Sequence, residues 1–99
     1  MTIKRIQDRI RSGKYRFSDH SVKQMIKRNV IRHEVEGAIL AGEIIEEYPD
    51  DKYSPSCLIY GKTEVGRDLH IQVSYPPSVV VVTVYEPDRE EWVDCRTRR

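Results

Sequence analysis

The chain has 99 residues, 33% of them charged and 38% hydrophobic, which is the size and composition of one globular domain. No stretch approaches the ~18 consecutive apolar residues of a membrane span, and the charged N-terminal segment is unlike a signal peptide. These properties exclude a membrane-spanning chain, so we expect one cytoplasmic domain over residues 1–99.

Charge is distributed unevenly along the chain, although the formal net charge is only +1. Residues 1–33 contain ten Lys/Arg and two Asp/Glu, a net charge of +8, whereas residues 34–99 contain seven and fourteen, a net charge of −7. A basic half of this kind can bind the phosphates of RNA. The plainer explanation is that the two halves neutralise each other in the fold, and the sequence leaves both open.

The first segment has the periodicity of a short amphipathic helix. Ile3, Ile6 and Ile10 fall on one face of a helix over residues 2–12, and Gly13 is a natural stop. Because isolated helices of this length are marginally stable, we expect this one to dock on the rest of the domain.

The second helix has the best-defined start in the chain. Ser18 suits the N-cap, and Asp19 suits the positive end of the helix dipole. The apolar side chains of Val22, Met25 and Ile26 share one side of this helix, which we expect to be its buried face.

The second half changes from helical to strand periodicity. A third helix with Val35, Ala38 and Ile39 on one face ends at Gly42. Four strands are predicted, at Glu43–Tyr48, Cys57–Tyr60, Leu69–Tyr75 and Val79–Tyr85. The last is an unbroken apolar run, which predicts the central strand. The element order predicts an α+β fold, with three N-terminal helices packed on one face of a roughly four-stranded antiparallel sheet.

The C-terminal segment is short and polar. Residues 88–94 predict one helical turn, in which Trp92 anchors the end of the domain. The basic tail over residues 94–99 is expected to be mobile.

Strong catalytic and metal-binding motifs are absent from the sequence. Cys57, Cys95 and the three histidines do not have the spacing of a metal site, so we expect neither a metal nor another cofactor. Both cysteines are expected to be ordinary thiols, and a disulfide has no support.

Scattered His, Arg and Tyr side chains suit metal-free cleavage of RNA. That reaction needs a base for the 2′-hydroxyl, a cation for the phosphate and an acid for the leaving oxygen. His20 is the candidate base, because the helix N-terminus favours neutral imidazole. Arg28, on the same helix face, is the candidate phosphate stabiliser. His70, on the polar face of its strand, and Tyr85 are the candidate acids.

Four further side chains are candidate RNA contacts: Lys23, Gln24, Lys27 and Arg67. Every candidate also has a plainer explanation. The helix residues suit a solvated surface, His70 a wet strand face and Tyr85 the core with a satisfied hydroxyl. The sequence alone leaves these alternatives open.

Several segments have a characteristic order: Phe17-Ser18-Asp19-His20 with Met25 and Arg28, Val30-Ile31, Ala41-Gly42-Glu43-Ile44-Ile45, and Thr83-Val84-Tyr85-Glu86-Pro87 before Trp92. Together they resemble the domain of unknown function 4258 family. The resemblance spans roughly residues 14–93 and leaves the helix over residues 2–12 as an addition. Asn29, where glycine is expected, and Arg32, where a polar cap is expected, depart from the family pattern.

That family is similar to the RelE/BrnT group of small bacterial toxins, which cleave RNA and are held inactive by an antitoxin encoded alongside. The resemblance implies a RelE-like fold and a toxin of a toxin-antitoxin pair acting as a metal-independent endoribonuclease. Its partners would be RNA and a cognate antitoxin. The alternative is a non-catalytic module that pairs with another protein, or with a second copy as a homodimer, through the first helix or a strand edge.

Overall fold

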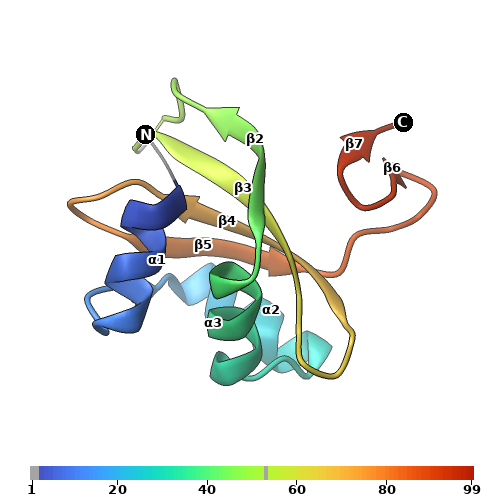
Figure 1. Ribbon diagram of the computed structural model, residues 1–99, viewed down its shortest axis with the longest axis horizontal. Helices are drawn as coiled ribbons and strands as arrows, with labels where there is room; N and C mark the ends of the chain where they lie inside the picture. Colours follow the sequence, from blue (N-terminus) through green and yellow to red (C-terminus); the bar gives the residue numbers. More distant parts are fainter. Residues whose placement is uncertain (1–2, 53) are drawn as a thin grey trace.

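Five strands form one mixed sheet in the order β1-β5-β4-β3-β2 (Figure 1). They are β1 (Arg16–Phe17), β2 (Glu43–Tyr48), β3 (Ser56–Lys62), β4 (Asp68–Ser74) and β5 (Val80–Tyr85). β1 pairs with β5 in parallel, and the other neighbours pair antiparallel. The computed structural model describes residues 3–52 and 54–99.

Three helices and one small hairpin complete the fold. The helices are α1 (Ile3–Arg11), α2 (Asp19–Arg28) and α3 (Arg32–Leu40), and the hairpin consists of β6 (Trp92–Val93) and β7 (Thr97–Arg98). The predicted α+β class is therefore confirmed. Thr2, where the first helix was predicted to start, and Tyr53, in the loop before β3, lie outside the described residues.

The prediction of a four-stranded antiparallel sheet is wrong by one strand. The N–H of Arg16 donates to the Val79 carbonyl at 3.2 Å, and the N–H of Ser18 donates to the Val81 carbonyl at 3.0 Å. These bonds make β1 a parallel edge strand and the sheet a mixed one. Two residues are too few to give a periodic signal, so the sequence did not reveal this strand.

The central strand is β4 and not β5, which corrects a second prediction. Leu69, Ile71 and Val73 of β4 are fully buried, as their alternation predicts. The apolar run in β5 does not reflect cover on both faces, because Val81 and Val84 are buried in the core whereas Val80 and Val82 are only partly buried and line a cleft on the other face.

The second helix packs in an unexpected orientation. Its N-cap is confirmed, since the Ser18 hydroxyl accepts the N–H of Ser21 at 3.1 Å. The predicted buried face is wrong for Val22 and Ile26, which are 41% and 77% exposed, whereas Met25 packs against the core and Ser21 is fully buried. The helix lies against the edge of a strand, where a small residue permits close approach and the side-chain oxygen of Gln24 accepts the N–H of Val84 at 2.9 Å.

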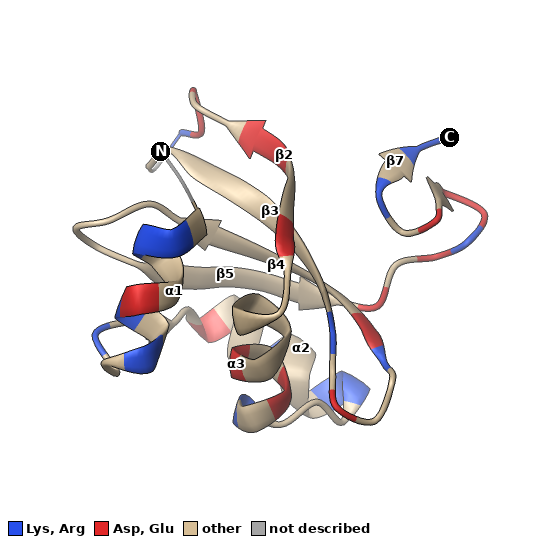
Figure 2. Cartoon of the chain, viewed as in Figure 1, with Lys and Arg blue, Asp and Glu red and all other residues tan. Residues whose placement is uncertain are grey.

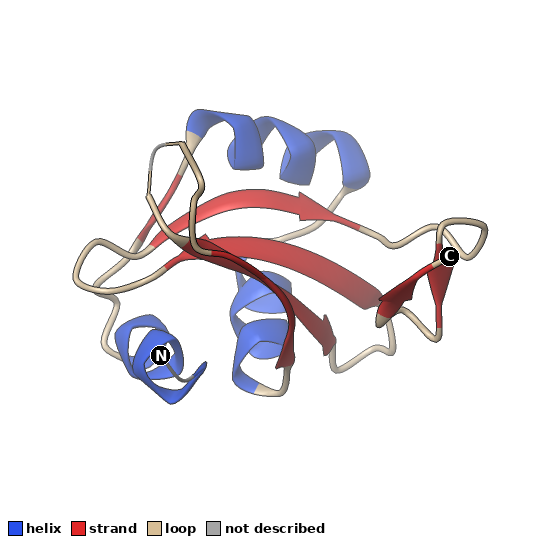
Figure 3. Ribbon diagram, turned by 90° about the horizontal axis from the view of Figure 1, so that it is seen from above, coloured by secondary structure: helices blue, strands red, loops and turns tan. Residues whose placement is uncertain are grey.

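The main core lies between the sheet and the helices α1 and α3. Seen from above, α1 and a second helix lie on one side of the strands, and another helix lies beyond them on the side of β5 (Figure 3). Ile6 and Ile10 of α1 and Ile39 of α3 are buried in one cluster with Ile59 and Ile71 of the sheet. The predicted placement of all three helices on one face is therefore correct for α1 and α3 only.

The basic tail is ordered, contrary to the prediction of a mobile end. β7 pairs with β6, and Trp92 of that hairpin is buried against the open face of the sheet. The side chains of Arg96 and Arg98 pair with Glu43 and Glu46 on β2. The tail thereby covers one end of the sheet.

Gly61 allows α3 and β3 to lie in close contact. A methyl group at Gly61 would come within 1.9 Å of the Ala38 carbonyl oxygen. We expect Gly61→Ala to lower the free energy of unfolding by about 3 kcal/mol in urea denaturation, because overpacking forces the backbones apart. Gly37→Ala is the matched control, because a methyl group there meets nothing within 4 Å and a helical alanine is expected to add about 0.5–1 kcal/mol. Equal unfolding midpoints for the two variants would contradict this contact.

Candidate functional site

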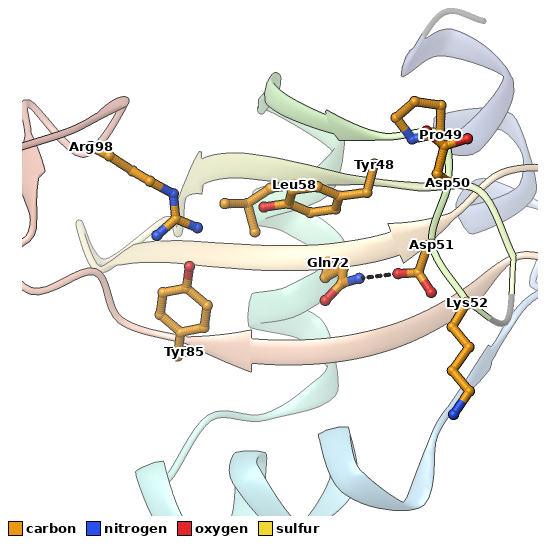
Figure 4. A pocket seen from close by; sticks show the side chains of 9 residues that line it. All are labelled: Tyr48, Pro49, Asp50, Asp51, Lys52, Leu58, Gln72, Tyr85 and Arg98. Atoms are coloured by element: carbon orange, nitrogen blue, oxygen red, sulfur yellow. Dashed lines mark hydrogen bonds between the residues drawn. The ribbon is translucent and has the colours of Figure 1, made fainter.

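The face of the sheet opposite α1 and α3 contains a cleft of about 680 Å³. Leu58 of β3, Gln72 of β4 and Tyr85 of β5 form its floor, because they alternate with the core residues of their strands. The loop after β2 forms one wall, and Arg98 of β7 lies at the other end (Figure 4). The cleft thus brings together side chains from five separate segments.

A buried histidine and a tyrosine are hydrogen-bonded at one end of this cleft. His70 Nε2 lies 2.6 Å from the carbonyl oxygen of Cys95, and His70 Nδ1 lies 3.1 Å from the hydroxyl of Tyr85. A carbonyl oxygen can only accept, so Nε2 carries the hydrogen and neutral Nδ1 is an acceptor. The Tyr85 hydroxyl therefore donates to His70 and keeps its lone pairs for another donor.

Burial keeps this pair neutral. His70 is fully buried, with the Trp92 ring centroid 4.4 Å from that of its imidazole. Burial lowers the pKa of His70, although the Cys95 carbonyl opposes this effect. Burial also raises the pKa of Tyr85, against the opposing charge of Arg98. His70 does not lie on a wet strand face, as one of the alternatives assumed, but under the β6–β7 hairpin.

A strained turn places the Cys95 carbonyl on His70. Asp94 and Cys95 have φ values of 52° and 62°, and the N–H of Arg96 donates to the Val93 carbonyl at 3.0 Å. This geometry is a type I′ turn, which favours asparagine, aspartate and glycine, so Asp94 suits it. For Cys95 the left-handed conformation costs about 1–2 kcal/mol. The hydrogen bond to His70 helps to offset that cost.

A second polar network fixes the amide of Gln72 on the cleft floor. Gln72 Nε2 donates to the carboxylate of Asp51 at 3.0 Å and to the hydroxyl of Ser56 at 3.0 Å. The Ser56 hydroxyl donates to the same carboxylate at 3.1 Å. Because a carboxylate only accepts, the nitrogen of Gln72 faces Asp51 and its oxygen faces away.

Arg98 provides a cation beside Tyr85. Its guanidinium lies over the Trp92 ring, 4.6 Å from the ring centroid, and donates to Glu46 at 2.9 and 3.2 Å. The Arg98 side chain is nevertheless 61% exposed, so an anion in the cleft can reach it. Stacking and ion pairing hold the guanidinium in one position.

The structure brings together two of the four predicted catalytic residues. His70 and Tyr85 are hydrogen-bonded, whereas His20 and Arg28 are exposed on α2. Within residues 3–52 and 54–99, no hydrogen bond or ion pair joins the side chain of His20 or Arg28 to His70 or Tyr85. Their roles stay predictions.

Two of the predicted RNA contacts have structural partners. Gln24 accepts the N–H of Val84, as described above. The guanidinium of Arg67 donates to the carbonyls of Arg28 and Asn29 at 3.1 and 2.9 Å, and it pairs with Glu34 and Glu86. Arg67 thus ties the end of α2 to the β3–β4 hairpin. Lys23 and Lys27, by contrast, are exposed on α2.

The basic N-terminal part is not neutralised by ion pairs. Among the Lys and Arg residues in the described part of residues 1–33, only Arg11 and Arg32 pair with a carboxylate, from Asp8 and Glu36. Blue Lys and Arg positions mark α1 and the C-terminal end of α2 in Figure 2. Eight cations have no ion-pair partner among the described residues: Lys4, Arg5, Arg9, Lys14, Arg16, Lys23, Lys27 and Arg28.

Sequence reasoning missed three residues of this site: Gln72, Cys95 and Arg98. Cys95 and Arg98 belong to a hairpin whose strands have two residues each, and Asp94-Cys95 is not a usual pair for its turn. Gln72 was detectable, because strand alternation places it on the same face as His70. In the part of the chain that the structure describes, no three His, Cys, Asp or Glu side chains are placed to hold a metal ion.

Comparisons with known proteins give one match. Residues 17–86 match the model of the family described as Domain of unknown function (DUF4258). No curated protein and no solved structure matches the chain significantly, so nothing found links it to the RelE/BrnT toxins. Among the described helices, none has the length and apolar character to cross a membrane.

Burial of His70 makes the stability of the fold depend on pH. The unfolded chain binds a proton at His70 near the ordinary histidine pKa of about 6.5, whereas the folded chain does so only at lower pH. The free energy of unfolding is therefore expected to fall between pH 7.5 and pH 5.5, by at most about 1.4 kcal/mol per pH unit. Urea denaturation at both pH values measures this. His70→Gln is expected to reduce the dependence, and exposed His20→Gln to retain it; an unchanged dependence in His70→Gln would contradict the assignment.

Proposed function

The chain belongs to the DUF4258 family, and we propose that it is a toxin-like endoribonuclease that cuts RNA without a metal. The RelE-like relationship and a cognate antitoxin that holds the enzyme inactive are parts of the same proposal. The observation that carries the chemistry is the hydrogen bond from Tyr85 to buried His70, beside Arg98, at the end of an open cleft.

The Tyr85–His70 pair can accept the proton of a ribose hydroxyl. The 2′-hydroxyl donates to the Tyr85 oxygen while the proton of Tyr85 passes to Nδ1 of His70. The resulting imidazolium keeps its Nε2–H on the Cys95 carbonyl. A base that is neutral near pH 7 suits this step, and burial of His70 favours its neutral form.

Bond changes at phosphorus follow from that proton transfer. The 2′-oxygen bonds to phosphorus, and the bond from phosphorus to the 5′-oxygen breaks. The 5′-oxygen takes a proton from water, which leaves a 2′,3′-cyclic phosphate and a 5′-hydroxyl. The guanidinium of Arg98 stabilises the additional negative charge on the phosphate, and His70 later releases its proton to solvent.

Binding of the RNA chain is assigned to the unpaired cations of α1, β1 and α2. Arg16 of β1 lines a second cleft on the open face, beside Ser18 at the start of α2. Asp51 lines both clefts, so they are neighbours. A strand of RNA can therefore pass from the basic edge of the sheet to Tyr85.

A second candidate function is a non-catalytic interaction module. The first helix does not provide its contact surface, because Ile6 and Ile10 are buried within this chain. Val22 and Ile26 favour α2 instead, since both are exposed and lie one helical turn apart. A salt-insensitive oligomer in size-exclusion chromatography, without RNA binding at low salt, would favour the module. A small antitoxin-like protein encoded beside the gene would favour the toxin.

Removal of one oxygen tests the chemistry. We expect Tyr85→Phe to lower the rate of RNA cleavage by about 10²–10⁴-fold, the usual contribution of a proton-transfer group. End-labelled RNA in the presence of EDTA reports the rate, and the cyclic phosphate reports the mechanism. Tyr15→Phe is the matched control, because Tyr15 does not line the cleft and its hydroxyl donates to Glu36 of α3.

The same assay separates the two assignments of the base. If the Tyr85–His70 pair is the base, His20→Ala is expected to retain cleavage. Loss of cleavage in His20→Ala, together with full activity in Tyr85→Phe, would instead identify His20 of α2 as the base. Intact RNA with the unaltered protein, under all salt conditions, would overturn the nuclease.

Salt dependence tests the binding surface. On single strands each phosphate contact adds about 0.7 to the magnitude of the slope of log affinity against log salt. The double variant Lys23→Gln/Lys27→Gln is therefore expected to lower that magnitude by about 1.4 in fluorescence anisotropy with single-stranded RNA. Lys62→Gln is the control, because Lys62 pairs with Asp68 at 3.6 Å. An unchanged slope in the double variant would exclude α2 from the RNA-binding surface.

A further inference from the structure

We propose that the middle of the cleft is a subsite for guanine, recognised by the side-chain oxygen of Gln72. This inference rests on the proposed function, because it names the base of the nucleotide whose 2′-hydroxyl would donate its proton to Tyr85. It adds a specificity-determining residue to a site that so far contains only groups for proton transfer and charge.

The side chain of Gln72 has one fixed orientation. Both hydrogens of its amide are used, one toward Asp51 and one toward Ser56. Its oxygen has no hydrogen-bond donor among the described residues and points toward the Tyr85 end of the cleft (Figure 4). Since Ser56 is buried and fixed by the same carboxylate, this acceptor is held in place before any ligand arrives.

The surroundings of Gln72 suit a flat ring. Leu58, which is only 2% exposed, forms an apolar floor, and Tyr48 places its ring at the side of the cleft (Figure 4). A cleft of about 680 Å³ has the size of a typical small-ligand site. Aromatic side chains bind nucleobases by stacking, which is a common mode of single-strand RNA recognition.

The position of Gln72 connects this subsite to the proton-transfer pair. His70 of β4 faces Tyr85 of β5, and Gln72 faces Thr83. Gln72 and Tyr85 are therefore diagonal neighbours on one face, a relation that places Cβ atoms about 7–8 Å apart. One nucleotide can span that distance, with its base at Gln72 and its ribose at Tyr85.

Charge selects among the four bases. Guanine presents two adjacent donors, N1–H and the N2 amino group, whereas adenine and cytosine present one amino donor beside a ring acceptor. Uracil presents one donor between two acceptors. The carboxylate of Asp51, 3.0 Å from the nitrogen of the same Gln72 amide, adds negative charge near that end of the base and so disfavours a ring acceptor beside the Gln72 oxygen. The N1–H and N2 side of guanine contains only donors and avoids this repulsion, with its O6 acceptor on the far side of N1–H.

Mononucleotide binding tests the subsite without any cleavage. Titration of the full chain with GMP, AMP, CMP and UMP, followed by NMR chemical shifts at low salt, is expected to give roughly 10-fold tighter binding of GMP. Inosine monophosphate, which lacks only the N2 amino group, is expected to bind several-fold more weakly than GMP. Equal affinities for all five would overturn the proposal, because they would report the phosphate alone.

A variant locates the effect. Gln72→Met keeps the side-chain length but removes the acceptor, so the preference for GMP is expected to disappear. The variant is compared with Lys62→Gln, a replacement on the neighbouring strand and outside the cleft lining. If the variant folds poorly, the same contact is tested in the wild-type protein, where addition of GMP is expected to change the NMR chemical shift of the Gln72 side-chain amide. A retained GMP preference in folded Gln72→Met would overturn the role of Gln72.

Failure of this subsite and failure of the nuclease give different results. Cleavage of RNA after every base at similar rates, with no GMP preference, would remove the guanine subsite and leave the nuclease. GMP preference without any RNA cleavage would leave the subsite and remove the nuclease.

Discussion

The hydrogen bond between His70 and the Cys95 carbonyl is the contact on which the open face of this protein depends. It joins the central strand to the C-terminal hairpin across 25 residues of chain. It sets the imidazole tautomer, and the tautomer sets the direction in which Tyr85 donates. The same hairpin brings Arg98 to the cleft. One polar contact thus positions the hairpin over the sheet, the His70–Tyr85 pair and the guanidinium of Arg98.

Local signals predicted local structure well. Ser18 caps α2 as predicted, because this effect depends only on neighbouring backbone groups. The prediction of the buried face of α2 was wrong because that face depends on tertiary packing. A helix on a sheet face buries apolar side chains, but a helix on a strand edge must satisfy backbone groups, as Gln24 does. Nothing in the periodicity distinguishes these two environments.

The candidate site was predictable where strand register brings residues together. His70 and Tyr85 lie directly opposite each other on paired strands, and alternation gives both the same face. His20 and Arg28 were chosen from a helix pattern, which cannot specify the side on which a helix docks. Arg98 and Cys95 depend on a hairpin too short to leave a pattern, with a cysteine at a turn position that favours glycine. Long-range placement, and not residue chemistry, was the missing information.

The unpaired cations of the N-terminal part have a consequence for the folded state itself. Like charges on α1, β1 and α2 repel one another when no carboxylate stands between them, and this repulsion opposes compaction. Dissolved ions screen it. A rise in ionic strength therefore has two opposite effects. It reduces the repulsion within the folded protein and so stabilises the fold, and it also weakens the binding of a polyanion. A bound polyanion supplies the missing counter-charges, so ligand and fold stabilise each other through the same side chains.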